Sequence, residues 1–257
     1  MKLLSLLLFA SIFAMNGLEL TIKMENRPKP DDVKSTNTMI ISKEKKKDKI
    51  RELISMSKDD SEKQMIWFLK PAKDKGISFL KIEYEDKDDL MKMWLPGFKR
   101  FKRIAASDKS DSFMGSDLSF EDLTNRNIND YSYKIIDSKK CEYSSQNDNK
   151  KEMYDCYILE SIPNEIDTEY SKHITTIIEI EKDIFISIKE DSYDSNNELL
   201  KTKKIKYGNF DSTYIMTYIF VKNVQKKSST KLTVNNISIN NNFSNDMFIE
   251  RSLKTLP

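Results

Sequence analysis

The chain has 257 residues, of which 33% are charged, and its 43 basic and 41 acidic residues leave a net charge of only +2. Binding to nucleic acid requires a concentrated basic excess, so this balance gives no reason to expect a nucleic-acid partner. Hydrophobic residues make up 38% of the chain and aromatic residues 10%. This apolar content is sufficient for the core of one large domain.

The first residues have the layout of a secretory signal peptide. Lys2 precedes an apolar run over residues 3–15, and Asn16 and Gly17 follow it. The run is too short to span a bilayer comfortably, and no cysteine follows it that would predict a bacterial lipoprotein anchor. We predict a leader over residues 1–17 and an exported mature domain over residues 18–257, with an uncleaved N-terminal anchor as the alternative.

After the leader, residues 18–25 fit a short helix that Pro28 and Pro30 end. The remaining chain is rich in short segments of β-branched and aromatic residues, bounded by Asp, Asn, Ser, Gly and Pro. We predict eleven strands, at residues 36–42, 64–70, 77–84, 90–95, 131–136, 156–161, 173–180, 184–190, 201–207, 213–222 and 231–239.

Two other segments are less clear. Residues 49–57 fit a helical face as well as a strand. Residues 244–254 fit a helix that Ser244 caps, with Met247, Phe248 and Leu253 facing inward. Turns such as residues 86–89 and 194–197 join neighbouring strands directly, which favours an antiparallel meander over parallel crossovers. With so many strands, the sheet must curl or split.

Cys141 and Cys156 flank a polar loop between two of the predicted strands. A hairpin would bring the two sulfurs together, and an oxidising compartment would allow a disulfide. Closing such a loop would contribute roughly 3 kcal/mol by chain entropy. Two free thiols remain the alternative.

Catalytic motifs are not evident. The single histidine, His173, lies at the start of a predicted strand, where we expect a surface position, and no nucleophile elbow or phosphate-binding glycine loop accompanies it. No His/Cys cluster has metal-ligand spacing. We therefore expect neither an enzyme nor a bound cofactor or metal.

Residues 64–123 hold both tryptophans together with many phenylalanines and methionines. An ordinary sheet core explains such content, but methionine beside aromatic rings also suits a cavity for an irregular apolar ligand. The strands at 64–70 and 90–95 are apolar on both faces, which a sheet with one face in solvent does not require. Next to them, Lys99, Arg100, Lys102 and Arg103 are either a solvated strand face or a docking patch for an acidic partner.

The segments at 68–84 and 93–123, which end in SFMGSDLSFEDL, closely resemble the outer membrane lipoprotein-sorting protein family of the LolA-like superfamily. The resemblance is dense over residues 68–123 and continues more loosely to the C-terminus. It implies a mainly β (α+β) fold, in which one strongly curved, unclosed antiparallel sheet forms a half-barrel around a few short helices and an apolar cavity.

The resemblance also implies a carrier in the periplasm that holds acyl chains of a lipoprotein or another lipid and moves them toward the outer membrane. An inner-membrane transporter of the RND type and an outer-membrane acceptor are the implied partners, and we expect a monomer. Our candidates for the cavity wall are Trp67, Leu69, Phe79, Leu80, Met91, Met93, Trp94, Phe113, Met114 and Phe120.

Residues 112–123 are predicted to form a loop-to-helix element, with Gly115 in a positive-φ turn and Ser116, Asp117 or Ser119 as the helix cap. Lys99, Arg100, Lys102 and Arg103 are the candidates for contact with a membrane-bound partner. A periplasmic module that senses the state of the envelope is the rival function, and a lipid-modifying enzyme is the third.

Overall fold

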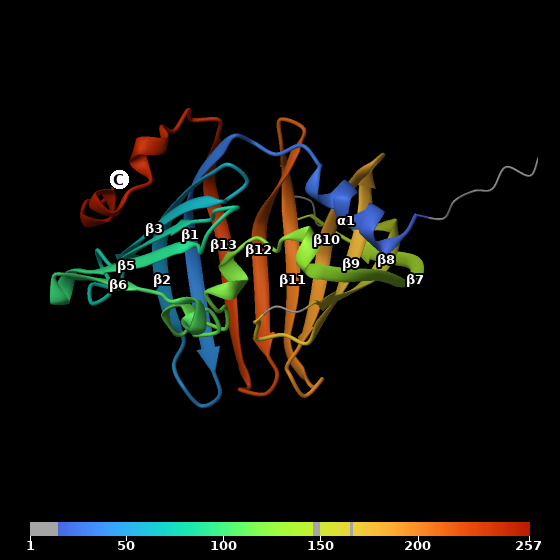
Figure 1. The fold of residues 1–257 in the computed structure, drawn as a ribbon, viewed down its shortest axis with the longest axis horizontal. Helices are drawn as coiled ribbons and strands as arrows, with labels where there is room; N and C mark the ends of the chain where they lie inside the picture. Colours follow the sequence, from blue (N-terminus) through green and yellow to red (C-terminus); the bar gives the residue numbers. More distant parts are fainter. Residues whose placement is uncertain (1–14, 146–149, 165–166) are drawn as a thin grey trace, which may run out of the picture.

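The computed structural model describes residues 15–145, 150–164 and 167–257. Within them, thirteen strands form one antiparallel sheet in the order β6-β5-β4-β3-β2-β1-β13-β12-β11-β10-β9-β8-β7 (Figure 1). The sheet is open, because β6 and β7 are its edges and do not pair with each other. The fold is therefore mainly β, as predicted.

The strands follow one another along the chain with short connections in most places. Their bounds are β1 (Asp32–Lys43), β2 (Lys49–Lys58), β3 (Lys63–Lys70), β4 (Ser78–Ile82), β5 (Leu90–Leu95), β6 (Arg100–Arg103), β7 (Tyr131–Tyr143), β8 (Glu152–Pro163), β9 (Lys172–Glu181), β10 (Ile184–Tyr193), β11 (Leu199–Phe210), β12 (Thr213–Asn223) and β13 (Ser228–Ile239). All eleven predicted strands are present. The ambiguous residues 49–57 lie in β2, where they pair with both β1 and β3.

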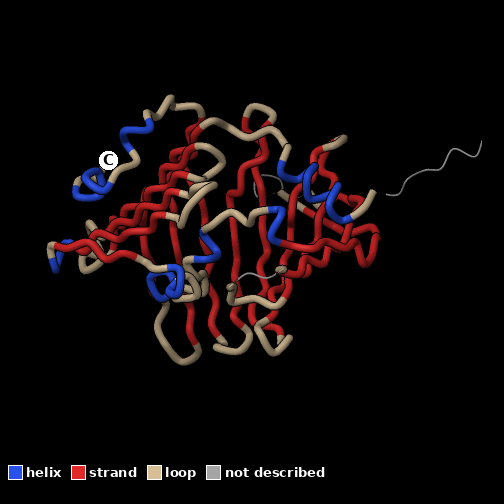
Figure 2. Tube along the Cα trace, in the orientation of Figure 1, coloured by secondary structure: helices blue, strands red, loops and turns tan. Residues whose placement is uncertain are grey.

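The sheet curves strongly around its inner face. Helix α1 (Gly17–Glu25) contacts both β7 and β10, although β8 and β9 separate these strands in the sheet. A flat sheet could not bring the two strands to one short helix. In Figures 1 and 2 the two ends of the sheet bend toward the same side, which gives a half-barrel.

The N-terminus of α1 is well capped. The Asn16 side chain accepts a hydrogen bond from the Glu19 backbone at 2.9 Å, and the Glu19 carboxylate accepts one from the Asn16 backbone at 3.0 Å. Gly17 lies so close to β7 that a Cβ atom there would be 2.7 Å from the Tyr133 carbonyl carbon. Residues 1–14 of the predicted leader, residues 1–17, lie outside the described residues. A mature chain that keeps the cap begins at or before Asn16.

The predicted short helices are confirmed only for α1. Apart from α1, the helical pieces of the described chain are short 3₁₀ segments: η1 (Pro96–Phe98), η2 (Ala106–Asp108), η3 (Phe113–Gly115), η4 (Glu121–Leu123), η5 (Ile128–Asp130), η6 (Asn245–Met247) and η7 (Glu250–Lys254). In residues 112–123, Gly115 has the predicted positive φ of 73°, but Met114 also lies in the left-handed region at φ 53°. Two such residues in succession prevent a continuous helix.

The C-terminal residues 244–254 also form two 3₁₀ segments instead of one helix. Phe248 and Leu253 are buried as predicted, whereas Met247 is 39% exposed and does not face inward. Phe248 has a non-helical backbone (ψ 64°), which divides the segment and rotates Met247 away from the core. Among the described residues, no helix is both long enough and apolar enough to cross a membrane.

Candidate functional site

The inner face of the sheet is crossed by one long connection. Residues 104–130, which we call the strap, run from the end of β6 to the start of β7 and contain η2, η3, η4 and η5 (Figure 1). Local backbone hydrogen bonds, such as that from Phe113 to the Leu118 carbonyl at 2.7 Å, shape the strap but do not tie it to the sheet. Its position depends on a series of side-chain anchors.

The first anchor is aromatic. Phe113 and Phe120 are 1% and 3% exposed and pack into the core with Phe68 and Phe79. The Phe113 ring lies 5.4 Å from Phe79 and 5.7 Å from Phe120, both in edge-to-face geometry. Aromatic pairs in this geometry stabilise the packing beyond their buried area.

Polar anchors hold the middle of the strap. The Asp117 carboxylate accepts hydrogen bonds from Ser228 and Thr230 of β13, and the bond from Thr230 measures 2.7 Å. Arg51 of β2 donates to the Met114 carbonyl at 2.8 Å and to the Asp74 carboxylate at 2.7 Å. The strap is therefore bonded to strands on both sides of β1.

The strongest anchor is a buried carboxylate. Asp122 has no exposed side-chain surface, and its two oxygens accept from Lys203 at 2.8 Å and from Lys201 at 3.1 Å. The Tyr170 hydroxyl donates to the same carboxylate at 2.9 Å. Burial alone would raise the pKa of Asp122, but the charges of Lys203 and Lys201 outweigh it and hold that pKa well below its usual range.

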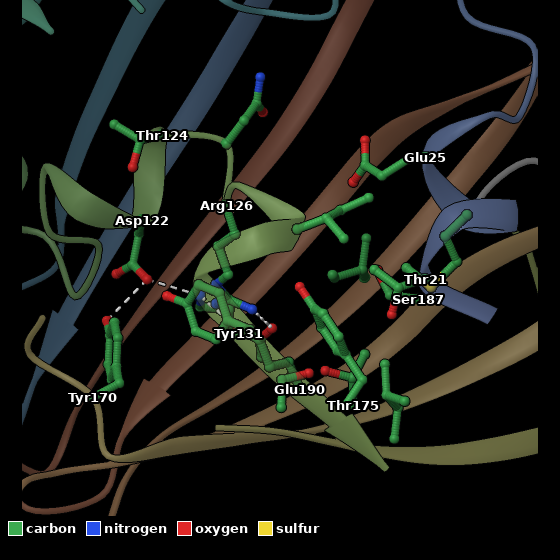
Figure 3. A pocket seen from close by; sticks show the side chains of 18 of the residues that line it. Thr21, Glu25, Asp122, Thr124, Arg126, Tyr131, Tyr170, Thr175, Ser187 and Glu190 are labelled. Carbon is green, nitrogen blue, oxygen red and sulfur yellow. Dashed lines mark hydrogen bonds and ion pairs between the residues drawn. The ribbon is translucent and has the colours of Figure 1, made fainter. Parts of the chain in front are cut away.

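A second ion pair continues this arrangement toward β7. Arg126 forms a bidentate pair with Glu190 of β10, at 2.6 and 3.0 Å (Figure 3). Lys203 also contacts Glu190, at 2.9 Å. Burial would raise the pKa of Glu190, but Arg126 and Lys203 outweigh it and lower that pKa well below its ordinary value.

These pairs form one cluster, which we call the ion cluster: Arg126, Lys201 and Lys203 with Asp122, Glu169 and Glu190. Three cations face three carboxylates, so the cluster is electrically balanced. A buried ion pair adds little net stability compared with apolar packing, but removing one partner leaves an uncompensated charge at high cost. The cluster thus specifies where the strap lies.

His173 lies against the ion cluster and is completely buried, which contradicts the predicted surface position. Its Nδ1 is 2.9 Å from the Ser192 hydroxyl and 3.3 Å from Arg126. Burial, together with the positive charge of Arg126, lowers the pKa of His173 to about 3. The sequence placed this histidine at the start of a strand, but β9 is covered there by the strap and by Tyr170.

The grouping of Ser192, His173 and Glu190 resembles a hydrolytic triad in composition only. Ser192 and His173 both have 0% exposure, so a substrate has no access to the hydroxyl. Within the described residues, no group of three or more His, Cys, Asp or Glu side chains is placed to hold a metal ion.

Two cavities lie beside the strap. The larger, of about 420 Å³, lies between the strap and strands β1, β2, β3, β11, β12 and β13. Its apolar lining comprises Val33, Met39, Leu53, Ile66, Phe113, Leu118, Leu123, Ile215, Met216, Ile219, Leu232 and Val234. Charged residues, including Arg27, Lys29, Asp31, Lys58 and Asp60, also border it. We call this space the inner cavity.

The smaller cavity, of about 300 Å³, lies between the strap, α1 and strands β7–β12. Its lining is more polar and includes Glu25, Tyr131 and members of the ion cluster (Figure 3). Asp122, Asn125 and Ile219 border both cavities. The lining of the inner cavity is therefore the more apolar of the two.

The ten predicted cavity residues divide between the two faces of the sheet. Those packed on the strap side are Phe79, Met91, Met93, Phe113, Met114 and Phe120. Those packed on the outer face, with the C-terminal segment, are Trp67, Leu80 and Trp94. Leu69 is partly buried and belongs to neither cluster. Of the ten, Phe113 borders the inner cavity, while Trp67 borders a different one on the outer face.

The four predicted docking residues, Lys99, Arg100, Lys102 and Arg103, are all exposed, at and just before the edge strand β6. Arg100 lies over the exposed Phe98 ring at 5.4 Å. Charges on an edge strand discourage pairing with another chain, which is a sufficient structural reason for them.

At the opposite end of the sheet, Cys141 of β7 and Cys156 of β8 form a disulfide, with Cα atoms 6.0 Å apart.

Sequence reasoning missed the ion cluster entirely. The sequence predicted residues 201–207 only as a strand and gave Lys201 and Lys203 no role. The available signal was the spacing of Lys201 and Lys203 with Ile205, which puts two cations on the same strand face as an apolar residue. That pattern predicts buried cations that need carboxylate partners.

The open half-barrel, crossed on its inner face by the strap, is a LolA-like fold. The chain belongs to the family whose model, described as "Uncharacterized protein", matches residues 60–255. The search of curated proteins found no match.

Solved structures confirm the resemblance to outer membrane lipoprotein-sorting proteins. A putative outer membrane lipoprotein-sorting protein domain from Vibrio parahaemolyticus is 25% identical with a TM-score of 0.81, covering 93% of this chain and 98% of that one. A DUF1329 family protein from Desulfovibrio piger is 27% identical with a TM-score of 0.79, covering 92% and 97%. A LolA superfamily protein from Nitrosomonas europaea, 16% identical with a TM-score of 0.69 over 93% and 100%, shares the fold.

Proposed function

We propose that this protein is a non-enzymatic carrier that shelters the acyl chains of a lipoprotein, or of another lipid, in the inner cavity. The observation that carries the proposal is the apolar space of about 420 Å³ between the strap and the open sheet. Its size falls within the range of sites that enclose small ligands. The similarity to a putative lipoprotein-sorting domain supports a lipid as the cargo.

Physical chemistry makes such a cavity an effective carrier. Each methylene group removed from water contributes about 0.8 kcal/mol, so a partly buried chain binds without specific polar contacts. The charged residues beside the cavity would keep the polar end of the lipid in water. Export after removal of the predicted leader would place the carrier in the periplasm, where it would shuttle cargo toward the outer membrane.

Filling the inner cavity should prevent cargo binding. Val234 of β13 lines the cavity and is partly buried, so Val234→Trp would occupy space needed by the chain. If the indole excludes two methylene groups of the cargo chain from the cavity, the binding free energy weakens by about 1.6 kcal/mol, which lowers the affinity about fifteenfold. The measurement is mass spectrometry of organic extracts from protein purified out of its native compartment.

The matched control is Thr233→Trp, because Thr233 is adjacent in β13 and faces the opposite side of the sheet. It should retain the lipid content of the unmodified protein. Equal lipid content in both variants, or no lipid in the unmodified protein under conditions that keep a known carrier loaded, would contradict the proposal. An envelope-sensing module need not copurify with lipid.

The exposed basic residues at β6 are the proposed contact with a membrane-bound partner, such as an RND-type transporter. Charge steering raises association rates and is sensitive to salt. We expect Lys102→Glu with Arg103→Glu to slow handover from inner-membrane vesicles about tenfold at low ionic strength. Lys226→Glu with Lys227→Glu, in the exposed turn between β12 and β13, is the control; equal rates for both pairs would rule out this docking surface.

A further inference from the structure

The outer face of the sheet carries a second cavity that the carrier function does not use. The C-terminal residues 244–257 pack against β2, β3 and β4 on the face opposite the strap (Figure 1). Phe248 and Leu253 are 2% and 1% exposed there, and the Ser78 hydroxyl donates to the Leu253 carbonyl at 2.7 Å. The segment is therefore firmly attached at these points.

Beside this attachment, the segment and the sheet enclose about 410 Å³. The residues of this outer cavity that matter for its chemistry are Met56, Met65, Trp67, Phe248, Arg251 and Leu256. No residue borders both this cavity and the inner one. In β3, Met65 and Trp67 point to the outer face and Ile66 to the inner cavity, as strand alternation requires.

The lining is apolar and adaptable. Methionine side chains are flexible and polarizable, and together with an indole ring they suit a ligand of irregular shape. Leu256 is 41% exposed, so the cavity leaves apolar surface accessible at its edge. Such a wall favours a hydrocarbon chain over a polar or peptide ligand.

The one charged side chain at this cavity favours a ligand with negative charge. This side chain, Arg251, is exposed and forms no ion pair within the described chain. The nearby acid, Glu250, is already paired with Lys92.

We propose that the outer cavity binds an anionic single-chain amphiphile, a long-chain carboxylate, with its tail against Met56, Met65 and Trp67 and its carboxylate on Arg251. A carboxylate suits a guanidinium because two parallel hydrogen bonds can form. This site is separate from the inner cavity and does not depend on its cargo.

The test uses the full chain carrying Trp94→Phe, which leaves Trp67 as its single tryptophan. Dibromostearate, a fatty acid whose bromines quench indole fluorescence on contact, should quench Trp67 in a saturable way below its micelle concentration. Arg251→Gln should weaken the apparent affinity about tenfold, as expected for losing one charge-assisted contact. The methyl ester of the same acid has no carboxylate charge, so it should bind the site with intact Arg251 about tenfold more weakly than the free acid does.

Lys254→Gln is the matched control, because Lys254 lies on the same segment over the Trp94 and Phe101 rings and does not line the cavity. It should change the affinity less than twofold. Absence of saturable quenching, or quenching that Arg251→Gln leaves unchanged, would overturn the proposal. Val234→Phe, which fills the inner cavity without adding a tryptophan, should leave the dibromostearate curve intact, so failure of the inner-cavity proposal would not affect this result.

Discussion

Replacing Asp122 with asparagine is expected to lower the free energy of unfolding by about 3–5 kcal/mol, the usual cost of removing one partner from a buried ion pair. The variant leaves Lys201 and Lys203 buried without the carboxylate that lies 3.1 and 2.8 Å from them. The measurement is denaturant unfolding, with hydrogen exchange of residues 112–130 reporting whether the strap is released first.

Asp111→Asn is the matched control, since Asp111 lies in the same strap with an exposed side chain. It should change stability by no more than about 0.5 kcal/mol. Adding Lys203→Met to Asp122→Asn should recover part of the loss, because it removes one uncompensated cation. If Asp122→Asn behaved like Asp111→Asn, the ion cluster would not hold the strap.

Stability should also fall as the pH drops through the titration range of histidine. The pKa of His173 is lowered from 6.5 to about 3 in the folded protein. Between these values the unfolded chain binds a proton that the folded chain does not, so stability is fully present above pH 6.5 and declines below it. One pKa unit corresponds to 1.36 kcal/mol, which gives a loss of about 2 kcal/mol between pH 6.5 and 5.

The sequence makes this experiment unusually clean, because it contains one histidine. His173→Asn keeps a polar atom near the position of Nδ1 and cannot titrate, so its stability should be nearly constant from pH 6.5 to 5. Below about pH 5, both proteins should lose stability. The pKa values of Asp122 and Glu190 are lowered in the folded protein, so these carboxylates take up protons more readily in the unfolded chain. Identical slopes for the two proteins above pH 5 would show that His173 does not titrate as described.

Local patterns were sufficient to predict most of the sheet. The strand at residues 77–84 alternates apolar and charged side chains, and this period of two exists within the segment regardless of its partners. Residues 49–57 could not be assigned in this way, because their apolar positions fit both periods. Pairing of β2 with β1 and β3 resolves the ambiguity.

The two faces of the apolar strands could not be distinguished from the sequence. Trp67 and Phe68 are both buried, but Trp67 packs under the C-terminal segment and Phe68 under the strap. A strand that is apolar on both sides indicates that both faces are covered. It does not indicate which segment covers each face. The predicted cavity residues therefore included side chains from both the strap side and the outer face of the sheet.

Residue types and their spacing were enough to predict an antiparallel sheet with an apolar region over residues 64–123, because strand periodicity and turns are local, whereas its open form was implied only by the family resemblance. The ion cluster and both cavities depend on contacts between distant segments: Asp122 and Lys203 are 81 residues apart and meet where the strap crosses β11. Such contacts arise from the curvature of the sheet and the path of one irregular connection. No local pattern encodes either of these, so the spacing of Lys201 and Lys203 with Ile205 signals a need for carboxylate partners but does not identify Asp122 as one of them.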